Sequence, residues 1–250
     1  MHNTYTRIIS EIQKYFKSAG IIRGVVGVSG GVDSALCLKL VVDALGSKNV
    51  TGILMPEKGV TSEENTMHAK KLCEFLKVEH HTVMINKFLL DFLALPWKPS
   101  NLAQINIKAR VRMLILYSYA NTENALVIGT SNKTELTLGY GTKYGDLGAD
   151  IEIIGDLLKE EVYKLAEHLG LPQEFLTKTP SAELYTGQTD EDELGMTYKE
   201  MDNILKYVNQ DLTKDEIINK GINPNSVHKI FRLQEINKHK LNPPHIICLK

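Results

Sequence analysis

The stretch from Val25 to Leu36 constrains the fold of this 250-residue chain most strongly. Its apolar start, Val25 to Val28, is bounded by glycines and predicts a short buried strand. The run breaks at Ser29-Gly30-Gly31, and an apolar helical pattern begins at Ala35. Glycines let the backbone approach a ligand closely, and the unpaired amides at a helix start attract anions. A strand, a glycine-rich turn and a helix N-terminus in this order therefore predict an anion-binding site.

Asp33 indicates what this turn binds. A carboxylate among phosphate-binding amides repels a phosphate unless a cation lies between them, so Asp33 indicates Mg²⁺. Ser29 and Ser34 can add hydroxyl donors. Because no lysine follows Gly31, the turn is not a Walker A loop and suits a leaving pyrophosphate better than a transferred γ-phosphoryl group. A purely structural turn with Asp33 as helix cap would explain a lone Gly-Gly pair, but it explains the full Ser29–Ser34 string less well.

Composition and charge exclude several functional classes. The chain is 43% hydrophobic and 24% charged, as is ordinary for soluble globular proteins, and its net charge of -1 disfavours broad nucleic-acid binding. It has no apolar run that could cross a membrane and no signal peptide at its N-terminus. Cys37, Cys73 and Cys248 form no Cys-x-x-Cys pair and fit reduced thiols better than a disulfide or zinc site. We therefore expect a cytoplasmic protein with neither nucleic acid nor membrane as a partner.

Apolar runs and helical patterns alternate along most of the chain. We expect strands near 25–28, 49–55, 78–85 and 125–130. We expect helices at 4–19, 35–45, 61–76 (capped by Thr61-Ser62), 101–119, 159–169, 198–207, 214–220 and 225–239. Strands that alternate with helices form parallel βαβ units, whose ligands bind at the carboxyl ends of the strands. The pattern predicts an α/β fold in a single domain, 1–250, with a doubly wound, mostly parallel, Rossmann-like sheet and helices on both faces.

Glu135 is a second candidate for metal binding. It lies just past the strand that ends at Gly129-Thr130, on the first turn of the next helix. A carboxylate there could join Asp33 on one Mg²⁺ ion, which takes one or two carboxylates together with phosphate oxygens. It could equally be an acidic first-turn residue that balances the helix dipole.

Three polar segments have the composition of functional loops. The first is the glycine-rich segment 139–150. Segments 57–64 and 179–193 contain or follow a proline and hold few apolar side chains, so we expect both to act as lids that exclude water once ligands bind. Because the acidic run 190–193 would repel phosphates, we expect it to face solvent.

The turn from Ser29 to Ser34 resembles the pyrophosphate loop of the ATP pyrophosphatase superfamily, which includes NAD, GMP, asparagine and argininosuccinate synthetases and tRNA-thiolating enzymes. The resemblance extends from the first strand to Pro243-Pro244 and implies the adenine nucleotide alpha-hydrolase type of fold. Four further motifs are similar, in order and spacing, to the NAD synthetase family: Asn-Ile-Lys-Ala-Arg at 106–110, Gly-Thr-Ser-Asn-Lys-Thr-Glu at 129–135, Lys-Tyr-Gly-Asp-Leu-Gly-Ala-Asp at 143–150, and Pro-Ser-Ala-Glu-Leu at 180–184.

The resemblance implies a two-step amidation of deamido-NAD (nicotinic acid adenine dinucleotide). The nicotinate carboxylate attacks the α-phosphate of ATP, giving an adenylate and Mg²⁺-bound pyrophosphate, and ammonia then displaces AMP to form NAD. Both steps need charge neutralisation and alignment rather than a protein nucleophile. Nothing before Thr4 resembles a glutaminase domain, so free ammonia is the expected nitrogen source unless a separate subunit supplies it. A homodimer with deamido-NAD at the subunit interface is the assembly that the resemblance implies.

Site residues follow from the resemblance, motif by motif. The positions that match ATP contacts are Gly27, Val28, Ser29, Gly30, Gly31, Val32, Asp33, Ser34, Thr130, Lys159 and Ser181. The positions that match deamido-NAD contacts are Arg110, Lys143, Asp150, His239 and Lys240. Asp33 and Glu135 match the metal ligands. The catalytic candidates are Asp33, Ser34, Lys159 and Asp146, the last as the residue that receives ammonium. The family more often has Thr at 181, and more basic residues at 241–242 than the Leu-Asn of this chain.

Two alternatives stay open on the sequence. One is another adenylating enzyme of the superfamily, such as a GMP-synthetase-like amidotransferase or a tRNA thiolase. GMP synthetases share the loop but lack the Lys-Tyr-Gly-Asp run, and a thiolase needs catalytic cysteines and a basic surface that this chain does not offer. The other is a nucleotide-binding module without turnover, against which Asp33, Glu135 and Lys159 argue.

Overall fold

The five strands of the described residues form one parallel sheet in the order β3-β2-β1-β4-β5. The computed structural model describes residues 1–178, 180–181, 184–185 and 187–249. The strands are β1 (Arg23–Gly27), β2 (Val50–Leu54), β3 (Glu79–Thr82), β4 (Ala125–Gly129) and β5 (Ile151–Glu152). The strand order reverses between β1 and β4, where a parallel sheet leaves a crevice at its carboxyl edge. The predicted doubly wound α/β sheet is confirmed.

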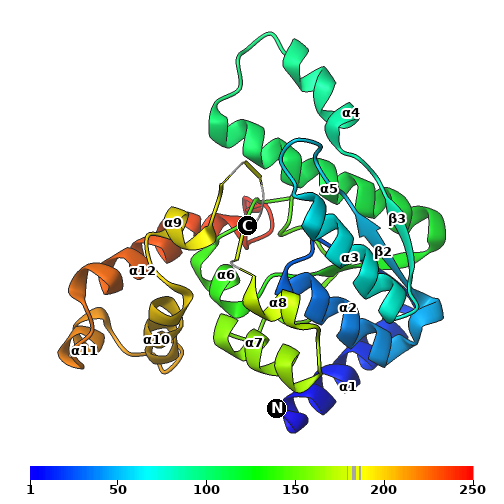
Figure 1. Ribbon diagram of the computed structural model, residues 1–250. Helices are drawn as coiled ribbons and strands as arrows, with labels where there is room; N and C mark the ends of the chain where they lie inside the picture. The colour runs from blue at the N-terminus through cyan, green and yellow to red at the C-terminus, as the bar shows by residue number, and fades with distance from the viewer. Residues whose placement is uncertain (179, 182–183, 186, 250) are drawn as a thin grey trace.

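Helices cover both faces of this sheet, as Figure 1 shows. Among the described residues, the longer helices on one face are α1 (His2–Ala19), α2 (Val32–Leu45), α3 (Glu63–Phe75) and α7 (Lys159–His168), whereas α5 (Asn101–Glu123) packs on the other. Neighbouring strand residues alternate between the faces: Val26 and Ile128 lie on the α2 side, whereas Val25 and Val127 lie on the α5 side. Burial on both sides explains why β1 and β4 are nearly continuous apolar runs.

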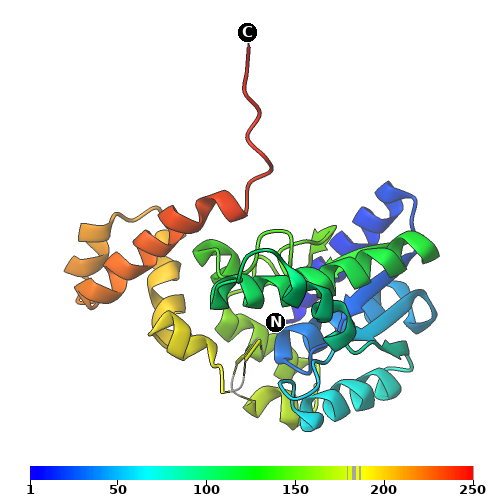
Figure 2. The same cartoon turned by 90° about the horizontal axis from the view of Figure 1, so that it is seen from above.

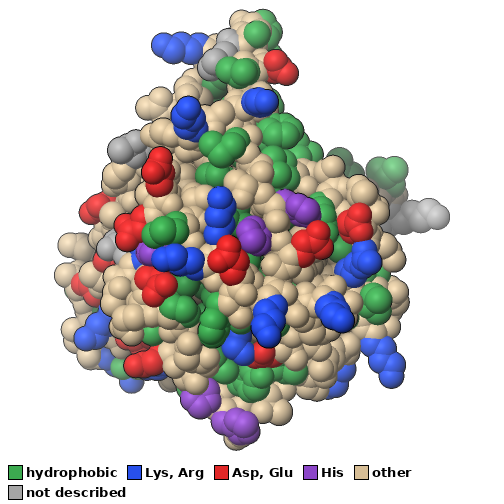
Figure 3. Space-filling view, turned by 45° about the vertical axis from the view of Figure 1, so that its right-hand side comes forward, with side chains coloured by type: hydrophobic (Ala, Val, Ile, Leu, Met, Phe, Trp, Pro, Cys, Tyr) green, Lys and Arg blue, Asp and Glu red, His purple; other side chains and the backbone are tan. Residues whose placement is uncertain are grey.

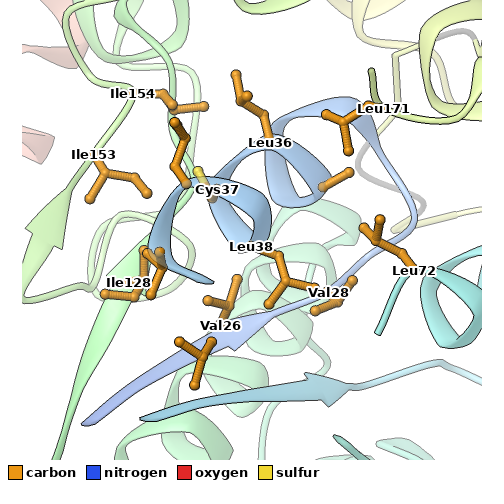
Figure 4. Close-up of a cluster of buried hydrophobic side chains, with 14 of the residues drawn as sticks. Val26, Val28, Leu36, Cys37, Leu38, Leu72, Ile128, Ile153, Ile154 and Leu171 are labelled. Carbon is orange, nitrogen blue, oxygen red and sulfur yellow. The ribbon is translucent and has the colours of Figure 1, made fainter. Parts of the chain in front are cut away.

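The core beneath α2 joins that helix to the two central strands (Figure 4). Leu36 and Cys37 of α2 are fully buried, and Val26 of β1 and Ile128 of β4 lie in the same cluster. The Sγ atom of Cys37 lies 3.7 Å from the carbonyl oxygen of Gly129, and burial raises the pKa of this thiol well above its usual value. Cys37 is therefore a packing residue. This packing fixes α2, and with it the turn that precedes the helix, against the sheet.

A second hydrophobic cluster lies beside the sheet, among the C-terminal helices (Figure 1). The helices that contribute to it are α6 (Lys133–Leu138), α9 (Asp190–Leu194), α10 (Tyr198–Val208), α11 (Lys214–Asn219) and α12 (Pro224–Asn237). Met201, Leu205 and Ile217 are fully buried within it. After α12 comes a 3-10 turn, η3 (Lys238–Lys240), and Figure 2 shows that 241–249 then extends away from the body.

Short elements account for most differences from the sequence predictions. They are α4 (Asn86–Leu89), α8 (Gln173–Thr177), α9 (Asp190–Leu194), η1 (Ser47–Asn49), η2 (Leu90–Ala94) and β5. Segments of this length are too short to carry a hydrophobic period. The α4–η2 segment forms an arm that projects beyond the body of the molecule at the top of Figure 1. None of the helices that the structure describes is long and apolar enough to cross a bilayer.

Candidate active site

The turn between β1 and α2 is held by its own side chains. Gly30 has a φ of 86°, and a Cβ atom there would lie 2.6 Å from the carbonyl oxygen of Asn65, so only glycine fits. The Ser34 hydroxyl accepts a hydrogen bond from the amide of Ser29 (3.2 Å) and donates one to the carbonyl of Gly31 (3.0 Å). The Ser29 hydroxyl in turn accepts from the amide of Gly31 (3.2 Å). In this structure the two hydroxyls therefore brace the turn from within.

Lys159 brings the two predicted metal ligands together. Its side chain is 2% exposed, and its Nζ atom lies 2.5 Å from Oδ2 of Asp33 and 3.7 Å from Oε1 of Glu135. Asn132 holds the other Asp33 oxygen, because its Nδ2 atom donates to Oδ1 at 3.0 Å. The same asparagine caps α6 through the amide of Glu135. Residues from the first turns of α2, α6 and α7 thus meet at one point on the carboxyl edge of the sheet.

The charges of this cluster are strongly coupled. Burial alone would lower the pKa of Lys159, but the carboxylates of Asp33 and Glu135 raise it above its usual value, so the ammonium form is favoured. Burial, and then the neighbouring Asp33 carboxylate, raise the pKa of Glu135 to about 8, against the lowering effect of Lys159. Two carboxylates share one ammonium, which leaves an excess of negative charge when both are ionised.

Helix α9 contradicts in part the prediction that residues 190–193 face solvent: Asp192 and Glu193 are exposed and Glu191 is half-buried, but Asp190 is buried. Asp190 is 5% exposed, and its carboxylate accepts hydrogen bonds from Tyr198 (2.9 Å) and Tyr140 (3.2 Å). The Tyr198 hydroxyl lies 3.3 Å from Glu135, and the Lys159 ammonium lies 4.8 Å from the centre of the Tyr198 ring. The phenol hydroxyls and the nearby ammonium compensate the buried charge, which composition alone does not reveal.

Two adjoining cavities, of about 250 and 490 Å³, lie at the carboxyl edge of the sheet. Both are lined by Ser29, Thr130, Asp146 and Leu184. Of the predicted ATP contacts, Gly27 and Val28 line only the smaller cavity. The predicted residues that line only the larger cavity are Gly31, Val32, Asp33, Ser34, Arg110, Glu135, Lys143, Lys159, Ser181, His239 and Lys240. Among the predicted residues, all of which the structure describes, Gly30 and Asp150 line neither cavity.

The segment 139–150 is tied to the C-terminal end of the chain. Lys143 Nζ donates to the carbonyls of His239 (2.6 Å) and Asn242 (2.9 Å). Lys240 Nζ donates back to the carbonyls of Gly139 (2.9 Å) and Gly141 (3.0 Å). The two predicted substrate lysines therefore hold the wall of the larger cavity together in this structure.

Asp146 and Asp150 have different environments. Burial raises the pKa of Asp146, whose Oδ1 atom accepts from the amide of Thr142 at 2.8 Å. Asp150 instead accepts from the amide of Val127 (2.7 Å) and from the hydroxyl of Tyr117 (3.1 Å). Asp146 thus lies at the cavities, whereas the carboxylate of Asp150 binds to β4 and α5.

Sequence reasoning missed three residues of the Lys159 cluster. Asn132 could have been found, since an N-cap residue followed three positions later by Glu135 is a capping-box pattern, which the structure contains. No local pattern marks Asp190 or Tyr198, because their role depends on contacts between α9, α10 and α6. Of the segment expected to form the second lid, residues 179, 182, 183 and 186 lie outside the described residues.

Asp33 and Glu135 both lie beside one cationic group, the Lys159 ammonium. The part of the chain that the structure describes contains no group of three or more His, Cys, Asp or Glu side chains that could hold a metal ion. Mg²⁺ does not require such a cage, because it is commonly bound by one or two carboxylates together with substrate phosphates. Two carboxylates beside a phosphate-type turn fit this donor set.

Known proteins are similar to this chain in sequence and in fold. A curated NH3-dependent NAD+ synthetase of Methanosarcina acetivorans is 43% identical over 242 residues, covering 95% of this chain and 94% of that protein. The one of Methanocaldococcus jannaschii is 42% identical, with 97% and 94% covered. The NH3-dependent NAD synthetase structure from Campylobacter jejuni superimposes with a TM-score of 0.84 at 32% identity, and the NMN synthetase structure from Francisella tularensis with 0.87 at 30%, each over 98% of both chains. The sequence profile described as NAD synthase matches residues 4–244, and the chain therefore belongs to the NAD synthase family.

Proposed function

We propose that this protein makes NAD+ from deamido-NAD, ATP and ammonia, through an adenylate formed beside the Lys159 cluster. Membership of the NAD synthase family supplies the overall reaction. The observation that carries the assignment of roles is the buried Lys159 ammonium, 2.5 Å from Asp33 and 3.7 Å from Glu135, beside the turn that precedes α2. An anionic triphosphate needs positive charge beside a glycine-rich turn at a helix N-terminus, and the reaction needs no protein nucleophile.

Adenylation rests on alignment. The N-termini of α2 and α7 meet at the Lys159 cluster, so their positive dipole ends favour the phosphates. Lys159 neutralises charge on the phosphates as the pyrophosphate leaves. Thr130 and Ser181, which line the larger cavity, offer hydroxyl groups on its other sides. Held in line with the α-phosphate, the nicotinate carboxylate gains the advantage of an intramolecular attack.

Asp33 and Glu135 would hold Mg²⁺ at this site. Bound there with phosphate oxygens, the ion would neutralise developing charge on the pyrophosphate. Asp33 is kept in place by Asn132 and Glu135 by the Tyr198 hydroxyl, so both carboxylates are oriented before any ligand arrives.

Asp146 is our candidate for receiving ammonium. It lines both cavities, and in our proposal the acyl carbon and the phosphate meet where these adjoin. Its buried carboxylate can attract the cation and accept a proton from it, which frees the ammonia lone pair for attack on the acyl carbon. The nitrogen then loses a second proton as AMP leaves. Arg110, Lys143, Asp150, His239 and Lys240 are our proposed deamido-NAD contacts. Four of these line the larger cavity, namely Arg110, Lys143, His239 and Lys240. Asp150 does not, and it would have to act through β4 and α5.

We further propose a homodimer in the cytoplasm. The arm formed by α4, η2 and the start of α5 carries large exposed apolar side chains, and Figure 3 shows such side chains on the upper projection of the molecule. They include Phe88 (50% exposed), Leu90 (60%), Trp97 (63%) and Leu102 (67%). Apolar side chains gathered in this way suit a subunit interface. The three cysteines are free, as a reducing compartment requires.

The function is tested by measuring AMP and NAD+ release from ATP, ammonia and deamido-NAD. Xanthosine monophosphate and aspartate replace deamido-NAD as controls for the other adenylating enzymes. Nicotinate mononucleotide is included as well, because one similar structure is that of an NMN synthetase. We expect ammonia-dependent NAD+ formation with AMP in equal amount. Turnover of xanthosine monophosphate or aspartate instead, or nucleotide binding without turnover, would refute the proposal.

A further inference from the structure

Lys108 is a residue of the 106–110 motif that the proposed function does not use. It lies on α5, and its side chain is 16% exposed. Its Nζ atom lies 2.8 Å from Oε2 of Glu57 and donates a hydrogen bond to the carbonyl of Leu184 at 2.7 Å. The Lys108 ammonium therefore joins the segments at Glu57 and Leu184, which are 127 positions apart in the chain and flank the cavities.

Glu57 anchors the segment on the first side. Its amide donates to the Thr61 hydroxyl (3.0 Å), and its carbonyl accepts from the Thr61 amide (2.9 Å), which closes a turn. Pro56 and Thr61 of this turn line the smaller cavity. The Glu57 side chain is only 11% exposed, and its Oε2 atom has no well-aligned hydrogen bond among the described residues, so its contact with Lys108 is held by charge.

Leu184 occupies the second side. Its carbonyl accepts from Lys108, and its amide donates to Oε1 of Gln188 at 2.7 Å, so the backbone is held at both polar groups. Leu184 lines both cavities and therefore lies where they adjoin. In the proposed function, the acyl-phosphate bond of the adenylate forms in this region.

The other polar residues of the motif hold a different segment. Asn106 accepts from the Thr142 hydroxyl at 2.8 Å, and Arg110 donates to the Lys143 carbonyl at 3.2 Å. One stretch of α5 thus supports the 139–150 segment through two residues and the Glu57 and Leu184 segments through a third. Of these three residues, Lys108 is the one that contacts Leu184, which lies where the two cavities adjoin.

We propose that Lys108 is a positioning residue that keeps Glu57 and Leu184 closed over the adenylate, so that the adenylate reacts with ammonia and not with water. This inference rests on the proposed function. In amidation a carbon-nitrogen bond forms, the carbon-oxygen bond to AMP breaks, and the nitrogen loses a proton. In the wasteful reaction water attacks the same carbon, the same carbon-oxygen bond breaks, and deamido-NAD (as the carboxylate) and AMP are released with both protons of the water.

The test measures how the adenylate is partitioned. Full-length protein is supplied with ATP, Mg²⁺ and deamido-NAD, with and without ammonia, and AMP and NAD+ are quantified together. We expect Lys108→Met to form AMP in excess over NAD+ by on the order of tenfold, the effect of losing one charge-assisted contact. AMP release without ammonia should rise in parallel. Lys108→Arg, which keeps the charge, should restore most of the coupling, and Glu57→Gln should lose part of it.

Lys39→Met is the matched control. This change breaks the 2.6 Å ion pair on α2 between Lys39, whose side chain is 22% exposed, and Asp43, whose side chain is 19% exposed. It should leave the ratio of AMP to NAD+ unchanged. An unchanged ratio in Lys108→Met overturns the inference, even if both products fall, because a merely structural role lowers the two equally. If wild-type protein forms no NAD+, the proposed function fails and the inference falls with it. If wild type and Lys108→Met both form AMP and NAD+ in equal amounts, the inference about Lys108 fails and the proposed function stands.

Discussion

The ammonium of Lys159 lies 2.5 Å from the carboxylate of Asp33, although 126 positions separate the two residues in the chain. The contact joins the first turn of α2 to the first residue of α7. Glu135 adds a second carboxyl group at 3.7 Å, so two negative charges face one positive charge when both carboxyl groups are ionised. Such a site is balanced better by a further cation than by the lysine alone, which is the electrostatic basis for the proposed metal role.

Replacement of either carboxylate tests that role. Asp33→Asn and Glu135→Gln keep the shape of the side chain but remove the charge that would hold Mg²⁺. We expect at least about a hundredfold loss of deamido-NAD-dependent AMP release, with an unchanged circular dichroism spectrum. Asp43→Asn, which removes a carboxylate paired with Lys39 on the same helix α2, should retain activity. Near-normal AMP production by either site variant at limiting Mg²⁺ would show that the metal assignment is wrong.

Removal of the Tyr198 hydroxyl tests the link between α9 and the site. Tyr198→Phe keeps the ring beneath Lys159 but loses the bonds to Asp190 (2.9 Å) and Glu135 (3.3 Å). Because Asp190 is buried, losing one donor should cost about 1.5–3 kcal/mol of unfolding free energy in urea. Activity should fall about tenfold as Glu135 loses its orientation. Tyr207→Phe, on the same helix with Lys220 5.3 Å from its ring, is the control; equal effects of the two variants would contradict the link.

The parts of the fold that the sequence predicted are those with a local cause. A run of valines between glycines forms β1, and Ser62 caps α3 by accepting from the amide of Asn65 at 3.1 Å. Both follow from neighbours in the chain, so pattern is enough. The carboxylates Asp33 and Glu135 were predicted to meet because parallel strands place their carboxyl ends at one edge.

The parts that could not be predicted depend on distant partners. The acidic composition of 190–193 favours solvent, but Tyr140 and Tyr198 supply hydroxyls that let Asp190 be buried. β5 has two residues, too few to show a period. Lys108 is a motif residue by sequence, yet its contacts with Glu57 and Leu184 arise only when three segments come together on α5.

Glu152 gives a prediction for the pH dependence of stability. Its Oε2 atom accepts from the Ser131 amide at 3.0 Å, and burial raises its pKa to about 7. The pKa of Glu152 is higher in the folded chain than in the unfolded one. The contribution of this group to the free energy of unfolding is therefore complete below about pH 4.5 and is lost as the pH rises through 7. Glu152→Gln keeps an acceptor oxygen without the charge. At pH 8 we expect the free energy of unfolding of this variant to exceed that of wild type by on the order of 1–3 kcal/mol, which a higher unfolding temperature would show. At pH 4.5 we expect no difference between the two.

Glu200→Gln is the control for that experiment. Hydrogen bonds from Thr197 lower the pKa of Glu200, so its contribution is lost only as pH falls below the usual range of a glutamate. Between pH 5 and 8 its effect should be flat. Parallel stability curves for wild type and Glu152→Gln over this range would contradict a raised pKa of Glu152.

The last prediction concerns assembly. Trp97 and Leu102 are 63% and 67% exposed at the end of the arm and the start of α5, so a partner subunit can bury them. Trp97→Glu with Leu102→Glu should place like charges across the proposed interface and give a monomer by sedimentation. Because the proposed deamido-NAD site lies at that interface, NAD+ formation should fall with dimerisation and recover in part at high protein concentration. Ile22→Glu, a change at a residue 69% exposed next to β1, should leave both unchanged. A wild-type monomer that is fully active at nanomolar protein would exclude the shared site.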